Sequence, residues 1–226
     1  MLQTVCQKFS GGCMMVFRRA DDEVQFLGTA FLVHENGYLL TVSHILPDEG
    51  QLMVVAGGAG NTFTPITQET VTSIPVKVAR RNLKQDVALL KMEAGMGMRL
   101  PDHFLGSAES IMVGNSVMAM GFSFGHQTLH ALIDMSAIIS AKVLSHNQSK
   151  LLLFDNMVHD GDRGGPLISV TEGLVVGIIN GRFDPQEASK SYIDSSRTLA
   201  ANTNISFAVA IDYGIALMEE EGLQPH

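Results

Sequence analysis

Three short segments of this 226-residue sequence contain the residue types that acyl-transfer chemistry requires. The first ends at His44, the second begins at Asp86, and the third is Asp160-Gly161-Asp162-Arg163-Gly164-Gly165-Pro166, called here the 160–166 loop. Acyl transfer uses a general base, a carboxylate that orients it, and a nucleophile beside donors that stabilise an oxyanion. Histidine, aspartate and a glycine-rich loop follow one another here in the order of one triad arrangement. The sequence therefore indicates a candidate hydrolytic centre.

Short apolar segments separated by turn residues must position these three segments. Many short strands with glycine-rich turns favour a β-sandwich or a β-barrel. A parallel sheet is disfavoured because the strands do not alternate with helical patterns. The predicted strands are Phe26–Val33, Tyr38–Val42, Leu52–Ala56, Val76–Ala79, Val87–Met92, Val117–Phe122, Ile133–Leu144, Leu151–Asp155, Pro166–Val170, Leu174–Ile179 and Ile205–Ala210.

The end of the chain is the one segment with a helical pattern. Within Ile211–Gly222, the apolar residues Ile211, Ile215, Leu217 and Met218 lie at near-helical spacing. The sequence therefore predicts a C-terminal α-helix.

Three other segments are predicted connections. Ala94–Glu109 joins the two halves of the chain, and the polar segment Pro185–Asn204 is a long surface loop before the last strand. Gly57-Gly58-Ala59-Gly60 is a hairpin turn rather than a phosphate-binding loop, because no Lys-Ser or Lys-Thr pair follows it.

Five pieces of the sequence, taken together, resemble the chymotrypsin-fold serine proteases, nearest to the HtrA (Deg) branch. Two of them are the Asp86 segment and the 160–166 loop. The resemblance runs from about Gly28 to Gly222. The remaining pieces are GTAFLVHENGYLLTVSH, LGSAESIMVGNSVMAMGFSFG and ISFAVAIDYGIALMEEEGL.

The resemblance implies an all-β fold of two antiparallel six-stranded β-barrels with a C-terminal α-helix. The N-terminal half, 1–108, would contain His44 and Asp86. The C-terminal half, 109–226, would contain the oxyanion loop and the helix. Together they would make one trypsin-like peptidase domain without a PDZ domain.

The resemblance also implies a role for each site residue. His44 would be the general base and Asp86 would hold its ring. The backbone N–H groups of Gly161 and Arg163 would form the oxyanion hole, and Gly164-Gly165 would allow a tight turn beside the substrate. An extended polypeptide would be the substrate or ligand.

The resemblance places substrate-binding residues in two places. Met157, six residues before the nucleophile position, would lie at the base of the specificity pocket, which favours a small or medium apolar side chain. One strand segment would line the cleft and pair with the extended peptide: Val176, Gly177, Ile178, Ile179 and Asn180.

The nucleophile position departs from the family pattern because it is Arg163 where Ser is expected. A guanidinium stays protonated at neutral pH and is not a nucleophile. Cys6 and Cys13 precede His44, and Ser169 lies in the following strand, so none of them replaces it. Catalytic inactivity is therefore expected for the chain as written.

Two hypotheses remain open for Arg163. The chain is a serine endopeptidase recorded with its nucleophile replaced, or a natural pseudoprotease that binds peptides or proteins. Asp162 is a second departure, because HtrA-type enzymes usually have a neutral residue there. A buried carboxylate needs a cation or backbone donors, and Arg163 is a candidate partner.

Composition excludes several other classes of function. The formal net charge is −8, and no cluster of basic residues exceeds the pair Arg80-Arg81, which argues against nucleic-acid binding. With 46% apolar and 17% charged residues, the chain is too rich in core residues to be disordered. No apolar run is long enough to span a membrane.

Metal and cofactor motifs are not found. The histidines lack HExxH or HxH spacing, so we expect neither a metal site nor a cofactor. The N-terminus lacks the pattern of a secretory signal, and the two cysteines, Cys6 and Cys13, lie close together. The sequence therefore predicts a cytoplasmic protein and leaves its oligomeric state open.

Overall fold

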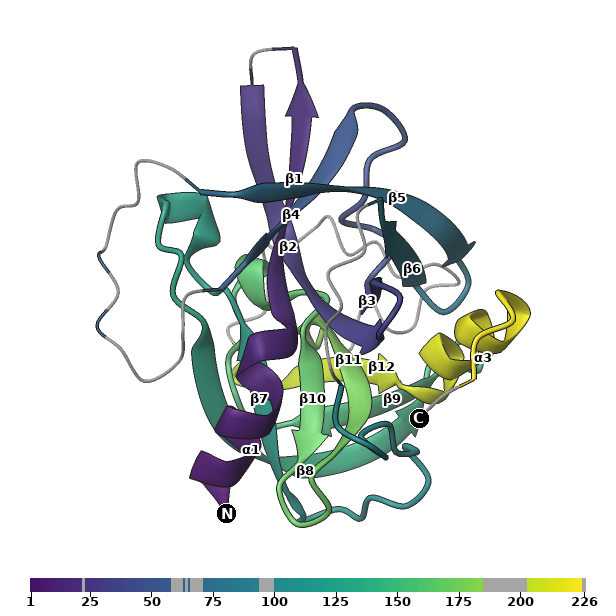
Figure 1. The fold of residues 1–226 in the computed structure, drawn as a ribbon. Helices are drawn as coiled ribbons and strands as arrows, with labels where there is room; N and C mark the ends of the chain where they lie inside the picture. Colours follow the sequence, from purple (N-terminus) through teal and green to yellow (C-terminus); the bar gives the residue numbers. More distant parts are fainter. Residues whose placement is uncertain are drawn as a thin grey trace.

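The strands of the chain form two closed antiparallel barrels, one from each half of the sequence (Figure 1). The computed structural model describes residues 1–21, 23–57, 63, 65, 71–93, 100–184 and 203–224. The N-terminal barrel has the order β1-β2-β3-β6-β5-β4, with β1 (Cys13–Ala20), β2 (Glu23–His34), β3 (Tyr38–Thr41), β4 (Gln51–Ala56), β5 (Ser73–Asn82) and β6 (Val87–Met92). The C-terminal barrel has the order β10-β11-β12-β9-β8-β7, with β7 (Ser116–Gly121), β8 (Ile133–Leu144), β9 (Lys150–Phe154), β10 (Pro166–Ser169), β11 (Leu174–Arg182) and β12 (Ser206–Ala210). The predicted fold is confirmed.

Among the described residues, α-helices lie near the two ends of the chain, and short 3₁₀ turns follow α1 or connect strands. They are α1 (Leu2–Phe9), η1 (Ser10–Gly12), η2 (Gly125–Gln127), η3 (Asp160–Asp162) and α3 (Asp212–Glu220). The predicted C-terminal helix is confirmed as α3.

Sequence patterning missed α1 and β1. The first five residues of β1 are all buried, so the strand shows no alternation of apolar and polar residues. The short helix α1 buries Val5 and Phe9, which are too few to give a periodic signal. Both elements depend on contacts with distant parts of the chain rather than on a local pattern.

Each terminal helix contacts the barrel formed by the other half of the chain. Lys8 of α1 donates through Nζ to the carbonyl oxygen of Gly173, just before β11, at 2.8 Å. Arg80 of β5 donates through Nε to Oε2 of Glu221, just after α3, at 2.7 Å. A boundary near residue 108 therefore separates the two halves of the sequence, but each half contacts the other through a terminal helix.

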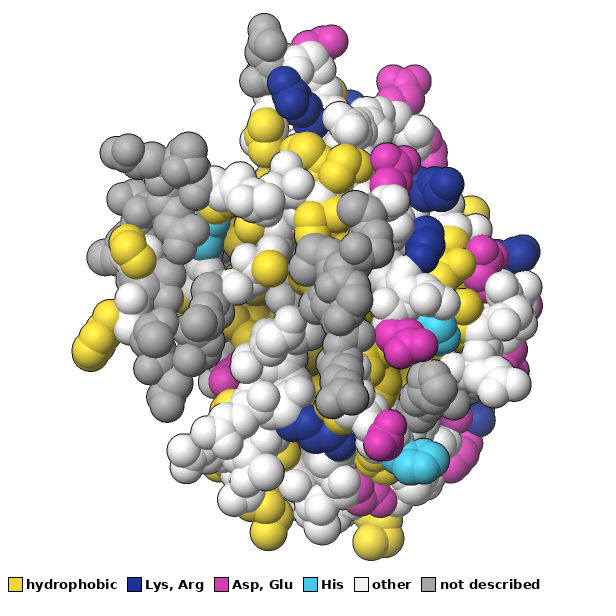
Figure 2. Space-filling model, in the orientation of Figure 1, with side chains coloured by type: hydrophobic (Ala, Val, Ile, Leu, Met, Phe, Trp, Pro, Cys, Tyr) yellow, Lys and Arg dark blue, Asp and Glu magenta, His cyan; other side chains and the backbone are white. Residues whose placement is uncertain are grey.

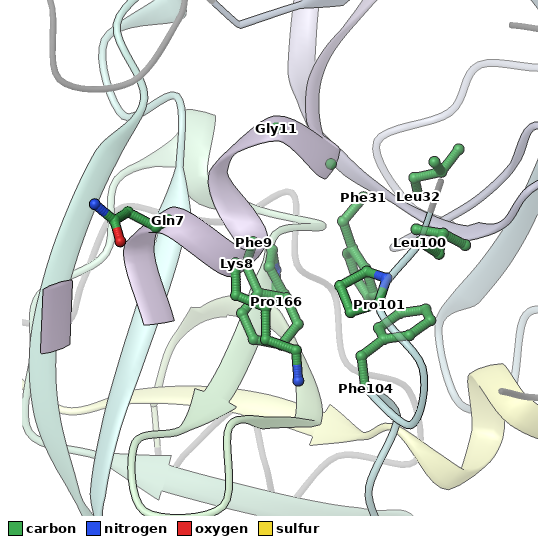
Figure 3. A pocket seen from close by; sticks show the side chains of 11 residues that line it. Gln7, Lys8, Phe9, Gly11, Phe31, Leu32, Leu100, Pro101, Phe104 and Pro166 are labelled. Atoms are coloured by element: carbon green, nitrogen blue, oxygen red, sulfur yellow. The ribbon is translucent and has the colours of Figure 1, made fainter. Parts of the chain in front are cut away.

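A pocket of about 290 Å³ lies where α1, β2 and β10 meet (Figure 3). Phe9, Phe31, Phe104 and Pro166 contribute apolar surface to it, and the rings of Phe9 and Phe104 lie 6.5 Å apart. Pro166 is also the last residue of the 160–166 loop. The N-terminal helix and the strand β10 that begins at Pro166 therefore line the same pocket.

The visible face in Figure 2 shows Lys and Arg side chains interspersed with Asp and Glu, without one continuous basic patch. Among the described residues, no helix combines the length and hydropathy that membrane crossing requires. Residues 94–99 of the predicted connection, 58–60 of the predicted hairpin turn and 185–202 of the predicted surface loop lie outside the described residues.

Candidate active site

His44 and Asp86 meet because the strands beside them are neighbours in the N-terminal barrel. Strand β3 pairs with β6, with Thr41 opposite Ala88, so the segment after β3 lies next to the turn before β6. Asp86 ends this turn with a φ of +57°. The Nδ1 atom of His44 lies 2.6 Å from Oδ2 of Asp86, and the His44 backbone N–H donates to Oδ1 at 2.8 Å. The carboxylate thus holds both the ring and the backbone of His44.

Asn180 supplies a second donor to the same carboxylate. Its Nδ2 atom donates to Oδ2 of Asp86 at 2.6 Å, and its side chain is buried. The pairing of β11 with β12 shifts register between Ile179 and Gly181, at this residue. The structure therefore brings Asn180 to Asp86, a contact that the sequence prediction missed. The available signal was a lone polar residue in the apolar run of β11.

Arg163 lies on the other side of the imidazole. Its Nη1 atom is 3.3 Å from Nε2 of His44, and its Nη2 atom is 3.0 Å from Oδ1 of Asp160. Only 11% of the Arg163 side chain is exposed. Burial lowers the pKa of the guanidinium, while the Asp160 carboxylate opposes that shift. Because a guanidinium only donates, Nε2 accepts and Nδ1 donates to Asp86.

A backbone hydrogen bond within the 160–166 loop joins Asp160 to Arg163. The N–H of Arg163 donates to the carbonyl oxygen of Asp160 at 3.3 Å and completes the η3 turn. This N–H is the one predicted to take part in the oxyanion hole, and that role stays a prediction. The Gly161 carbonyl oxygen accepts from Oγ1 of Thr29 at 2.7 Å.

Asp162 is held by neutral donors rather than by a cation. The Ser123 hydroxyl donates to Oδ1 at 2.6 Å, and the His159 backbone N–H donates to Oδ2 at 2.7 Å. Burial is the main cause that raises the pKa of the Asp162 carboxyl, and these two hydrogen bonds act against it. Of the two kinds of partner expected for Asp162, the structure shows the backbone donor, and Arg163 pairs with Asp160 instead.

The two glycines of the loop allow its backbone to lie close to both barrels. Gly164 has a φ of +86°, and a side chain there would collide with the Thr29 carbonyl oxygen and Oγ1 of Thr41. A side chain at Gly165 would collide with the Met120 carbonyl oxygen. The prediction of a tight turn at Gly164-Gly165 agrees with this geometry.

Most of the predicted substrate-binding strand lies inside the C-terminal barrel. Gly177, Ile178 and Ile179 pair with β12, and the backbone of β10 and of Gly165 covers the other side. Val176 is also fully buried, and its carbonyl oxygen accepts from the N–H of Ile211. The prediction for these four residues is corrected, because an extended peptide pairs only with a free strand edge. Beyond them, Gly181 faces the side chain of Arg163.

Met157 lies in the segment between β9 and η3, and 44% of its surface is exposed. Ser206 of β12 fixes the backbone on both sides of Met157: its Oγ donates to the Asn156 carbonyl oxygen and accepts from the Val158 N–H. The assignment of Met157 to a pocket base remains a prediction. In the described part of the chain, no group of three or more His, Cys, Asp or Glu side chains is arranged to hold a metal ion.

Comparisons with known proteins identify the family. Residues 28–178 match the family model of the trypsin-like peptidase domain. A probable periplasmic DegP-like serine endoprotease of Hahella chejuensis is 30% identical over 206 residues, covering 90% of this chain and 37% of that protein. A protein of the same description from Pseudomonas fulva is 31% identical over 159 residues, covering 69% of this chain and 29% of that protein.

Solved structures agree on the fold. The HtrA-type protease AlgW, bearing the substitution S227A and bound to a tripeptide, has a TM-score of 0.72 at 19% identity and covers 97% of this chain and 63% of that chain. AlgW with a decapeptide has the same TM-score of 0.72 at 17% identity, covering 97% of this chain and 67% of that chain.

The relatives also overturn the predicted cytoplasmic location, because DegP-like proteins that match this chain are described as periplasmic. That prediction rested on the pattern of the N-terminal residues and on cysteine usage, and the descriptions of the relatives contradict it. The chain spans about a third of the length of these relatives, 37% and 29% in the two cases above. On the family model, the relatives and the fold, the chain belongs to the trypsin-like peptidase family, in its HtrA branch.

Proposed function

We propose that this chain is a non-catalytic member of the HtrA branch that binds extended peptides without cleaving them. The observation that supports the proposal is the position of the Arg163 guanidinium, which lies between Nε2 of His44 and the Asp160 carboxylate. In this proposal Arg163 occupies the nucleophile position. A guanidinium there neither attacks a carbonyl nor leaves Nε2 accessible to a nucleophilic hydroxyl or a water molecule.

The surroundings of Arg163 favour a natural pseudoprotease over a damaged protease. Burying a charged guanidinium is costly unless it is paired and hydrogen-bonded. Here Asp160, three residues earlier, supplies the counter-charge at 3.0 Å. The same residue closes the η3 turn by accepting the Arg163 N–H. Asp160 thus contacts Arg163 twice: its carboxylate pairs with the guanidinium, and its carbonyl oxygen accepts from the backbone N–H.

Peptide binding is the activity that remains for such a cleft. The titles of the two AlgW structures describe a bound tripeptide and a bound decapeptide. In this chain the end of β11, at Gly181 and Arg182, lies next to the Arg163 side chain, and β12 pairs with one of its edges. We propose that this end of β11 lines the peptide site, that the two halves of the chain act as one domain, and that the protein works outside the cytoplasm.

A second candidate function is a serine endopeptidase inactivated at a single residue. The retained pair His44 and Asp86, with Nδ1 to Oδ2 at 2.6 Å, favours it, because that geometry is what a general base requires. The two candidates differ in what a serine at position 163 would restore.

The test compares the chain with Arg163→Ser, using a fluorophosphonate probe for activated serines and intact mass as the readout. We expect no labelling of either form, because the N–H at 163 is engaged with Asp160 and leaves the oxyanion hole incomplete. His44→Ala combined with Arg163→Ser is the control for labelling that does not depend on the base. Labelling of Arg163→Ser that His44→Ala abolishes would establish the inactivated endopeptidase and overturn the pseudoprotease proposal.

A further inference from the structure

Two arginine side chains hold one short segment at the mouth of the proposed cleft. Arg182, at the end of β11, donates through Nε to the Val158 carbonyl oxygen at 3.2 Å. Arg163 pairs with Asp160, two residues further along the same segment, at 3.0 Å. The segment Val158–Asp160 is therefore contacted by a guanidinium at each end. Arg163 and Arg182 are called here the arginine pair.

Gly181 places the arginine pair beside the strand end. A side-chain carbon built on Gly181 would lie 3.8 Å from Nε of Arg163, so this guanidinium lies over the glycine. Arg182 is the next residue along the strand. The two positive charges are close enough to repel, since Arg182 contributes to lowering the pKa of Arg163. Keeping two such cations together favours a negative group between them.

Two described acidic residues, Asp160 and Asp86, act electrostatically on Arg163. Asp86 is engaged with His44 and Asn180, on the far side of the imidazole. Asp160 pairs with Arg163, but 56% of its side chain is exposed, so solvent screens the attraction. For Arg182, the partner recorded among the described residues is a carbonyl oxygen rather than a carboxylate. Its forked donors are suited to bidentate binding of a planar anion.

We propose that the arginine pair is a carboxylate-binding subsite and that the cleft therefore selects peptides that present a carboxylate to it. The carboxylate comes from an acidic side chain or from the free C-terminus of the peptide. This inference rests on the proposed function, since it names the ligand class of the same cleft. Asp160 exchanges with the peptide carboxylate on Arg163, while Arg182 supplies the second guanidinium.

The test measures the binding of four short peptides to the full chain by isothermal titration calorimetry at low salt. The acidic probe is acetyl-Ala-Val-Ala-Glu-Ala-amide, and the neutral probe replaces Glu with Gln. The third probe has Gln and a free C-terminal acid, and the fourth has Lys and an amide. We expect a carboxylate to tighten binding about tenfold over the neutral probe, and higher salt to reduce this advantage. The first and third probes, each compared with the second, distinguish side-chain from C-terminal recognition.

Variants assign the effect to the arginine pair. Arg182→Gln should remove most of the carboxylate advantage, and Arg182→Glu should reverse the preference toward the Lys probe. These variants retain the buried Arg163 and its contacts with Asp160 and His44. Arg19→Gln is the matched control, because Arg19 is an exposed arginine on β1 and should leave the advantage unchanged.

The outcomes separate this inference from the proposed function. Equal affinities for charged and neutral peptides, or a carboxylate advantage that persists in Arg182→Gln, would overturn the carboxylate subsite and leave peptide binding intact. Failure of all four peptides to bind would overturn both proposals.

Discussion

Nη1 of Arg163 lies 3.3 Å from Nε2 of His44, on the side of the ring opposite Asp86. The imidazole is therefore placed between a carboxylate that accepts its Nδ1 proton and a guanidinium that donates to Nε2. This is the tautomer that a general base requires, but the basic nitrogen faces a permanent cation. Arg163 thus covers the atom through which His44 would act on a hydroxyl group.

The ion pair between Arg163 and Asp160 should stabilise the fold measurably but modestly. We expect Asp160→Asn to lower the free energy of unfolding by about 1 kcal/mol, since the exposed carboxylate is screened by solvent. Arg163→Met and the double variant complete a mutant cycle, measured by urea unfolding. The exposed pair Arg81 and Asp48, at 3.0 Å, is the control and should show a smaller coupling. A coupling indistinguishable from that of the control would contradict the assigned role of Asp160.

Asn180→Ala should destabilise the chain by about 1.5–3 kcal/mol, because the charged carboxylate of Asp86 would lose a buried donor at 2.6 Å. Urea unfolding at neutral pH measures this change. Gln25→Ala, which removes an exposed amide on β2, should cost much less. If both variants lose the same stability, the contact between Asn180 and Asp86 contributes nothing beyond the loss of a surface side chain.

Asp162 should make stability depend on pH. Burial raises the pKa of its carboxyl above the ordinary value of 3.8, so the folded chain retains this proton to higher pH than the unfolded chain. Its contribution to the free energy of unfolding therefore falls as pH rises from 3.8 through the raised pKa. In Asp162→Asn, the amide oxygen can accept from the His159 N–H, and the amide NH₂ can donate to the Ser123 hydroxyl. This side chain does not titrate.

Urea unfolding of both forms across this pH window provides the measurement for Asp162. We expect Asp162→Asn to gain stability relative to the natural chain as the pH rises. Burial raises the pKa of the Asp134 carboxyl as well, but that group is present in both forms and cancels in the comparison. A difference that stays constant with pH would show that Asp162 titrates alike in the folded and unfolded chains.

The two cysteines should be unreactive in the folded chain. Burial, aided by the carboxylate of Asp134, raises the pKa of Cys6 to about 11. Burial also raises the pKa of Cys13. At pH 8 the thiolate fraction of Cys6 is then about 100-fold below that of an ordinary thiol. Ellman's reagent should react slowly with the folded chain and rapidly with both thiols in concentrated urea.

Cys6→Ser assigns the signal in the thiol experiment. If Cys6 accounts for the slow reaction of the folded chain, this variant should lose that reaction and retain the reaction of Cys13 in urea. Reaction of the folded natural chain at the rate of a free small-molecule thiol would contradict the raised pKa of Cys6.

The sequence predicted strands from short apolar runs between turn residues, and it predicted the C-terminal helix from near-helical spacing, because both patterns are local. It missed β1, which pairs with β2 and β4, and α1, whose Lys8 reaches Gly173 far along the chain. It also missed the contact between Asn180 and Asp86. These features depend on which distant segments meet, and no local periodicity reports that.

The sequence by itself determined the residue types at the site: a histidine, an aspartate, a glycine-rich loop and an arginine at position 163. It could not determine which acid partners that arginine, and it left Asp162 as a candidate. The tertiary structure decided that Arg163 pairs with Asp160, while Ser123 and the His159 N–H satisfy Asp162. It also decided that the Arg163 N–H turns inward onto Asp160. The physical reason is that partner choice and N–H direction depend on backbone path and burial, which only the packed barrels fix.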